Sequence, residues 1–267
     1  MTHYASRGDL EELHRLVKES KYRDEKNLIV LQGSKIVKEW LEEGHGVYAI
    51  FKTPQAPSFL DQEDDEESLE YNVEPYTLAK AIGLEQSAQN YHVAVVEKPN
   101  FIEPRFDEDT LIFDGLQDPG NVGTLMRSAL AFGFKQIVLL DPSCDPFNDK
   151  VLRSSQGASL RLKLFKSSLD DFLQLLEKAP PSFSLWVAHA KCKRSHTLNE
   201  FTSQTQASSL WLVIGSEGRG PREELLNKGH LVHLPMRAGI ESLNAAVAGS
   251  ILASYVFQNR LDKGSIL

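Results

Sequence analysis

Residues 231–254, LVHLPMRAGIESLNAAVAGSILAS, decide the fold, because they predict a buried strand and a long helix joined by a loop. The apolar residues 231–234 suit a short strand, which has to end at Pro235 because proline cannot donate a hydrogen bond to a β-ladder. From Ser242, as N-cap, the pattern predicts a helix that runs to about Lys263.

The first turns of this helix are rich in small side chains, namely Ala245, Ala246, Ala248, Gly249 and Ser250. A glycine inside a helix costs about 1 kcal/mol relative to alanine. Small residues also let another backbone approach closely, so we expect tight packing against this face.

A second stretch, residues 210–214, predicts a buried strand that leads into the loop GSEGRGP and then a helix with Pro221 as its first residue. A glycine-rich loop at the carboxyl end of a strand is typical of a ligand site. The loop is not a dinucleotide fingerprint, because Glu217 stands where the second glycine is required. It is not a P-loop either, because Pro221 stands where lysine is required. A nicotinamide-dependent oxidoreductase would therefore lack its fingerprint here.

A third stretch, residues 111–129, LIFDGLQDPGNVGTLMRSA, predicts a strand, a turn and a helix. Together the three stretches resemble the SpoU branch of the SPOUT methyltransferases, with motifs at 121–127, 215–220 and 234–244 in the family's order. The resemblance implies transfer of a methyl group from S-adenosylmethionine to the 2′-hydroxyl of an RNA ribose. It also implies a deep C-terminal trefoil knot, an exception to the general rule that chains do not thread their own loops, and a homodimer.

This sequence departs from the family's last motif in two places. Arg237 and Ala238 precede Gly239, and Ala245-Ala246 stand where Val-Ser is usual. These departures concern the shape of the expected donor pocket.

The resemblance also implies the site residues. The expected catalytic residues are Asn121, Arg127, Glu217, Ser242 and Asn244, and the expected donor-binding residues are Ile214, Gly215, Leu234, Met236 and Leu243. From the residues alone a second interpretation stays open: Asn121, Ser242 and Asn244 would also serve as helix caps, and Glu217 as a surface carboxylate.

Arg127 has two candidate roles. Ribose methylation needs an in-line approach of the hydroxyl oxygen and a way to remove its proton. Gly123 lies one turn before Arg127 on the same helix face, so we expect room for a nucleotide to reach the guanidinium. Arginine is essentially always protonated, so it either positions phosphate and ribose or, as the family implies, accepts the proton.

Residues 1–103 predict a small α/β domain, and residues 104–267 a second α/β domain with a mainly parallel sheet. The first domain resembles the L30e-type RNA-binding domain that precedes the knot in many SpoU members. Candidate RNA-binding cations are Lys21, Arg23, Arg127 and Arg153; the alternative for Lys21 and Arg23 is a solvated helix face. The predicted elements are helices at 10–17, 36–41, 76–82, 149–157 and 170–176, and strands at 28–31, 47–51, 92–96, 111–113, 136–140, 185–188, 210–214 and 231–234.

The net charge of −8 is unusual for a protein with an RNA partner, so its distribution matters. Seven acidic side chains lie in residues 61–70, which predict a disordered surface loop. Residues 104–267 carry 18 basic and 17 acidic side chains. The acidity is therefore mostly one local tract, and it leaves room for basic patches elsewhere.

Composition limits the remaining classes. No apolar run approaches the roughly 20 residues of a membrane span. The acidic N-terminus is unlike a signal peptide. The presence of only two cysteines predicts a reducing compartment. Two cysteines cannot form a zinc site by themselves, and the eight histidines lack metal-ligand spacing, so we expect no metal site. We expect a cytoplasmic RNA 2′-O-methyltransferase, with an organelle left open. The alternative is a catalytically silent RNA-binding or ribosome-assembly protein of the same fold, against which the intact motif residues argue.

Overall fold

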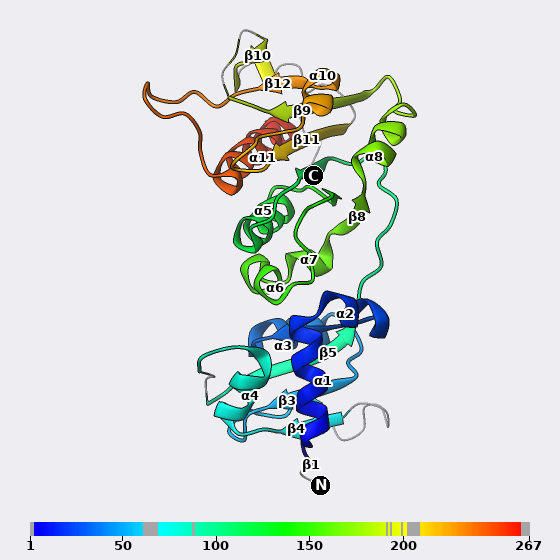
Figure 1. The fold of residues 1–267 in the computed structure, drawn as a ribbon, viewed down its shortest axis with the longest axis vertical. Coiled ribbons are helices and arrows are strands. Elements are labelled where there is room, and N and C mark those ends of the chain that lie inside the picture. The colour runs from blue at the N-terminus through cyan, green and yellow to red at the C-terminus, as the bar shows by residue number, and fades with distance from the viewer. Residues whose placement is uncertain are drawn as a thin grey trace. The chain divides into compact units, whose positions relative to one another are not determined.

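The computed structural model of the 267-residue chain describes residues 3–60, 69–86, 89–190, 192, 194–198, 200–201 and 209–262. The chain forms two compact units (Figure 1). The first comprises Met1–Pro99 with Phe147–Arg153, and the second comprises Asn100–Pro146 with Ser154–Leu267.

The first unit is a mixed sheet with helices. Its strand order is β1-β4-β3-β5-β2, with β1 at His3–Tyr4, β4 at Leu69–Asn72, β3 at Ala49–Lys52, β5 at His92–Glu97 and β2 at Leu28–Gln32. The helices are α1 at Arg7–Lys18, α2 at Ser20–Lys26, α3 at Ser34–Glu42 and α4 at Pro75–Ile82. Leu13, Leu16 and Val17 of α1 pack into the core with Leu78 and Ile82 of α4, as the helical spacing of apolar residues predicts.

Every helix and strand predicted in this region is present, whereas β1, α2 and β4 were not predicted. The acidic tract overlaps one of them. Residues 61–68 lie outside the described part of the chain, but Leu69 and Glu70 begin β4, and Ser58 Oγ donates to Glu70 Oε2 at 2.7 Å. The predicted loop is therefore wrong for its last two residues.

The second unit is built on a parallel sheet, which confirms the predicted fold class. Its strand order is β10-β12-β9-β11-β6-β7-β8, and each pair of neighbours is parallel. The strands are β6 at Thr110–Asp114, β7 at Gln136–Leu140, β8 at Lys163–Ser167, β9 at Phe183–Ala188, β10 at Ser195–His196, β11 at Ser209–Gly215 and β12 at His230–Val232. The helices are α5 at Pro119–Ala131, α7 at Ala158–Arg161, α8 at Leu169–Leu176, α10 at Glu223–Lys228 and α11 at Ala245–Asp262. Helix α6 at Asp149–Ser155 belongs to the first unit as far as Arg153.

The strand order reverses direction between β6 and β11. From β6 the chain continues to β7 and β8 on one side, whereas β9, β11 and β12 lie on the other. In parallel α/β sheets, ligands bind outside the carboxyl ends of the strands at such a switch point. The topology therefore places the expected site at the ends of β6 and β11.

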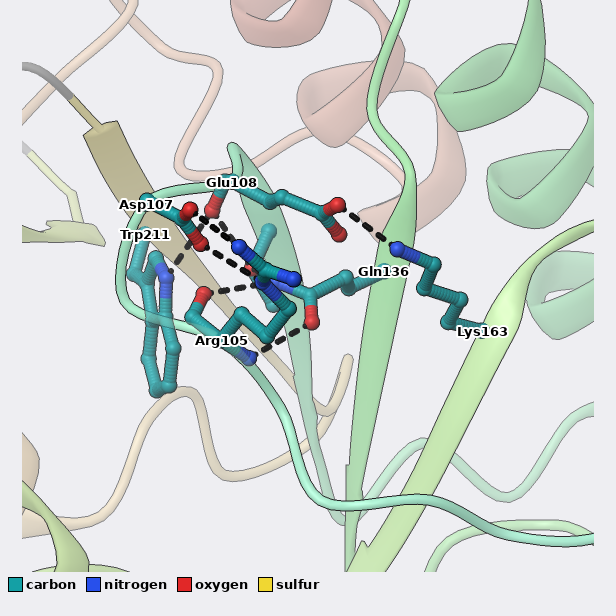
Figure 2. A network of polar contacts seen from close by, with 7 residues as sticks. Arg105, Asp107, Glu108, Gln136, Lys163 and Trp211 are labelled. Carbon is teal, nitrogen blue, oxygen red and sulfur yellow. Dashed lines mark hydrogen bonds and ion pairs between the residues drawn. The ribbon is translucent and has the colours of Figure 1, made fainter.

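The amino ends of the strands are fixed by a polar network (Figure 2). Gln136, the first residue of β7, accepts from the Arg105 backbone N–H at 2.7 Å and donates to the Arg105 carbonyl at 2.8 Å. Glu108 pairs with Lys163 at 2.6 Å, and its carbonyl accepts from the Trp211 indole at 3.1 Å. These contacts fix the segment that leads into β6. They lie at the amino ends of the strands, opposite the predicted site.

Several predicted element ends need correction. The helix predicted at 149–157 ends at Ser155, because Gln156 and Gly157 adopt left-handed conformations with φ +49° and +79°, and α7 begins after them. Helix α10 begins at Glu223 with Arg222 as N-cap, so Pro221 is not its first residue. Strands β8 and β10 were not predicted. The predicted helix end, Lys263, lies outside the described residues; α11 is described to Asp262.

Helix α11 packs closely on α5 and β11. A Cβ added at Gly249 would lie 2.5 Å from Leu125 Cδ2 and 3.1 Å from Ile214 Cγ1. Next to it, Ser250 Oγ donates to Ser128 Oγ at 2.7 Å. The expected close packing at the small-residue face is confirmed, and its partners are α5 and β11.

Candidate functional site

Three predicted site residues from distant segments meet in the second unit. Asn121 Nδ2 donates to Glu217 Oε1, and Asn244 Nδ2 donates to Asn121 Oδ1 at 3.0 Å. The Asn121 amide therefore uses both its donor and its acceptor to join the loop after β11 to the start of α11.

Asn121 is free for this role because another residue caps its helix. Asp118 is the N-cap of α5, and its Oδ1 accepts from the Asn121 backbone N–H at 2.8 Å. Asn121 is the third residue of the helix, after Pro119 and Gly120. The interpretation of Asn121 as a helix cap is wrong.

Asn244 caps its helix, as one interpretation predicted, and it also contacts Asn121. Its Oδ1 accepts from the backbone N–H groups of Ala246 at 2.9 Å and Val247 at 3.1 Å, which caps α11, while its Nδ2 contacts Asn121. Ser242, predicted as the cap, lies before the helix and lines the cavity described below.

The glycine loop closes tightly after β11. The Gly220 N–H donates to the Ser216 carbonyl at 2.8 Å. A Cβ on Gly215 would lie 2.2 Å from Pro221 N and 2.3 Å from Gly220 C, distances that real Cβ atoms do not reach. Only glycine allows the two ends of this loop to approach so closely.

A buried ion pair fixes the far end of the loop. Asp114, the last residue of β6, is 3% exposed; its Oδ2 accepts from the Arg222 backbone N–H at 2.7 Å and its Oδ1 from Arg222 Nε at 2.5 Å. Sequence reasoning missed this pair. The available signal was a single carboxylate at the end of an apolar strand, LIFD.

A cavity of about 310 Å³ opens beside this loop at the carboxyl ends of β9, β11 and β12. All five predicted donor-binding residues line it, and so do Glu217 and Ser242. His189 and Glu241 line it as well and were not predicted; His189 directly follows β9, which is the signal that could have found it.

The lining suits a sulfonium compound. Ile214, Leu234 and Leu252 supply apolar wall, which fits an adenine ring. Two carboxylates, Glu217 and Glu241, stand against one arginine, Arg219, so the formal charge favours a cationic ligand. The residues present therefore fit S-adenosylmethionine.

Arg127 is exposed on α5, six residues after Asn121. Within the described residues its guanidinium has no hydrogen-bond or ion-pair partner, so it is available to an external anion. Gly123, however, is buried by the protein itself. The prediction that Gly123 leaves open room for a nucleotide is wrong.

The remaining predicted RNA-binding cations differ in availability. Lys21 is exposed, but Arg23 is 3% exposed and its Nη1 donates to the carbonyls of Leu16 at 2.9 Å and Val17 at 3.1 Å. Arg153 pairs with Asp149 at 3.0 Å and donates to Gln32 Oε1 at 2.7 Å. Arg23 thus has a structural role in place of the predicted one, and the Arg153 guanidinium is engaged within the first unit.

Across the described ranges, no helix is long and apolar enough to cross a membrane. In the same ranges, no group of three or more histidine, cysteine, aspartate or glutamate side chains is arranged to hold a metal ion.

The profile of the SpoU rRNA Methylase family matches residues 109–254. The chain is 34% identical over 147 residues to the 23S rRNA (guanosine(2553)-2′-O)-methyltransferase RlmP of Bacillus subtilis, covering 55% of this chain and 56% of that protein. It is 29% identical over 248 residues to an uncharacterized tRNA/rRNA methyltransferase of Synechocystis, covering 91% of this chain and 87% of that protein.

Solved structures share the architecture. A putative RNA methyltransferase of the TrmH family from Porphyromonas gingivalis aligns with a TM-score of 0.78 at 28% identity, covering 94% of this chain and 98% of that one. The SpoU methyltransferase AviRb from Streptomyces viridochromogenes, in complex with the cofactor AdoMet, aligns with a TM-score of 0.78 at 22% identity, covering 95% and 98%. The second likeness is one of fold.

Proposed function

Because the chain belongs to the SpoU rRNA methylase family, we propose that it transfers a methyl group from S-adenosylmethionine to the 2′-hydroxyl of a ribose in rRNA or tRNA. The observation that carries the proposal is the contact of Asn121 with Glu217 and Asn244, beside a cavity lined by the five expected donor residues. The 2′-O-methyltransferase activity for which the Bacillus relative is named supports the 2′-hydroxyl as acceptor.

The donor, when bound, supplies an electrophilic methyl group on a sulfonium. The chain's own residues bind, orient and exclude water. Ile214, Leu234 and Leu243 enclose the donor, and the loop from Gly215 closes one side of it. Asn121 holds Glu217, which lines the donor cavity, and Asn244, which caps α11, in fixed positions, so that the site does not have to reorganise when the reactants bind.

We assign Arg127 to positioning of the substrate. Its guanidinium is exposed and unpaired in the described part of the chain, and a planar fork of donors matches phosphate and ribose oxygens. Arginine keeps its proton at neutral pH, which weighs against a role as proton acceptor.

The assembly and the division of labour are part of the same proposal. We assign RNA binding to residues 1–103 and methyl transfer to residues 104–267, in a cytoplasmic homodimer with a C-terminal knot. The dimer is supported by α11, which packs on α5 and yet exposes Val247, Tyr255 and Leu261 at 49%, 41% and 38%. Helix α11 is apolar both where it packs on α5 and on its exposed side, so a second protein surface is needed to bury the exposed side.

The proposal is tested with labelled S-adenosylmethionine and with rRNA and tRNA from cells that lack the protein. We expect label in RNA, and a 2′-O-methyl site that is absent from the starting RNA. Binding of RNA without transfer to either pool would favour the alternative, a silent RNA-binding protein.

A further inference from the structure

A second cavity, of about 300 Å³, lies against the same glycine loop. It is lined by Asp114 at the end of β6, by Gly115 and Gln117 after that strand, by Pro142 after β7, and by residues of 216–222 after β11. It therefore sits at the carboxyl ends of β6 and β11, where the strand order reverses. This is the position at which parallel α/β sheets bind ligands.

The two cavities share part of their lining. Ser216, Glu217, Arg219 and Gly220 line both. A ligand in the second cavity would be separated from the donor only by this loop, and Glu217 would face both molecules. The second cavity is thus a neighbour of the reacting centre.

The second cavity offers two unpaired polar side chains to a ligand. The Asp114 carboxylate is neutralised by Arg222 at 2.5 Å, and Glu217 accepts from Asn121. Arg219 and Gln117 are exposed, and neither has a hydrogen-bond partner among the residues that the structure describes. A guanidinium suits a phosphate, and a side-chain amide suits the donor and acceptor edge of a base.

The glycine at position 218 is not required by the fold. A Cβ added at Gly218 would meet no atom within 4 Å, and the Gly218 φ lies outside the left-handed region that demands glycine. Gly218 lines the second cavity and not the first. Neither packing nor backbone conformation explains a glycine here, whereas close approach of a ligand does.

We propose that the second cavity is the subsite for one nucleotide of the RNA substrate, with Arg219 against its phosphate and Gln117 at the edge of its base. The proposal rests on the proposed function and adds where the acceptor RNA binds.

Gly218→Val tests the subsite, because it fills the second cavity without touching the first. We expect the KM for rRNA or tRNA from cells that lack the protein to rise at least tenfold, with kcat and the Kd for S-adenosylmethionine within about twofold of native. Gln117→Ala, on a different element, should raise the same KM about threefold to tenfold, the range for one lost hydrogen bond. Gln174→Ala is the matched control for Gln117→Ala: Gln174 is exposed on α8 and lines neither cavity, so the KM of this variant should equal that of the native protein.

The subsite is overturned if Gly218→Val and Gln117→Ala both keep the native KM, or if Gln174→Ala raises it equally. A second readout separates this failure from failure of the proposed function. Ultraviolet cross-linking of the native protein to the same RNA should give nucleotide adducts on peptides that contain Gln117 or Arg219, whether or not methyl transfer occurs. Adducts confined to other peptides would contradict the subsite even if transfer were observed.

Discussion

Asn244 and Asn121 share a hydrogen bond of 3.0 Å across 123 positions of sequence. Through it, the cap of the last helix is held against the third residue of α5, and Asn121 in turn holds Glu217. One side chain thus sets the relative position of all three motif segments. Asn121→Ala would release both partners, whereas the cap of α5 would remain on Asp118.

Replacement of Gly215 should remove donor binding. A Cβ at this position would lie 2.2 Å from Pro221 N, so in Gly215→Val the loop has to open and the cavity beside it changes shape. We expect the Kd for S-adenosylmethionine, measured by calorimetry, to rise at least tenfold, which is about 1.4 kcal/mol. Gly218→Val, three residues away and outside that cavity, is the control that should keep the native Kd. Unchanged affinity in Gly215→Val would contradict a donor site at this loop.

Replacement of Arg127 should separate donor binding from methyl transfer. Arg127 does not line the donor cavity, so Arg127→Ala should keep the Kd for S-adenosylmethionine. Transfer of labelled methyl to RNA should fall by about a hundredfold or more. Arg127→Lys keeps the charge and loses the planar fork, so it should recover little activity. Full activity in the alanine variant would rule out the assigned role.

Gly249 should tolerate no side chain. Its Cβ would lie 2.5 Å from Leu125, so Gly249→Leu should lower the free energy of unfolding by about 1 to 3 kcal/mol through overpacking. Gly8→Ala, in α1, is the matched control with the opposite sign, because its nearest atom is 3.6 Å away and alanine favours the helix by about 0.4 to 1 kcal/mol. Urea unfolding measures both; a Gly249→Leu variant as stable as native would contradict the packing.

The dimer should depend on the exposed side of α11. Val247 is 49% exposed there, and Val247→Glu would put a charge into an apolar contact. We expect the native chain to sediment at twice the mass of one chain and Val247→Glu to sediment as a single chain. A native protein that stays monomeric at micromolar concentration would exclude the dimer.

Stability should depend on pH through His92. Burial lowers the pKa of its imidazole below the ordinary value, and the hydrogen bond to the Pro57 carbonyl opposes this shift. Because the folded pKa is the lower one, the unfolded chain binds more protons. Stability should therefore be complete above about pH 6.5 and fall below it, with a slope of up to about 1.4 kcal/mol per pH unit. In urea unfolding from pH 7.5 to 5.5, His92→Gln should reduce this slope and His45→Gln, at an exposed site, should not. Equal slopes in native and His92→Gln proteins would contradict the assignment.

The parallel sheet and the site could be predicted because their signals are local. Apolar runs such as 111–113 and 210–214 lie at the centre of the sheet, and the glycine loop follows one of them directly. The missed strand β8 lies at the sheet edge, where its sequence KLFKS contains two lysines and is only partly buried. Edge strands need fewer apolar residues, so composition does not distinguish them from loops.

The roles of single polar residues could not be predicted, because they depend on tertiary partners. Asp118, Asn121, Ser242 and Asn244 all have side chains that can cap a helix, and only the fold decides that Asp118 and Asn244 do so. Arg23 has the spacing of a surface cation, yet its guanidinium donates to carbonyls of α1.

The position of β11 in the sheet has a consequence for synthesis on the ribosome. This strand pairs with both β6 and β9, although both precede it in the chain. Until residues 209–215 have emerged, β6 and β9 each lack the neighbour that separates them in the native sheet, and each presents an unpaired edge. Strands β6 and β9 therefore cannot take their native places in the sheet until β11 has been synthesised. We expect the second unit to fold late and slowly compared with the first unit, since its central pairings join residues about 100 positions apart.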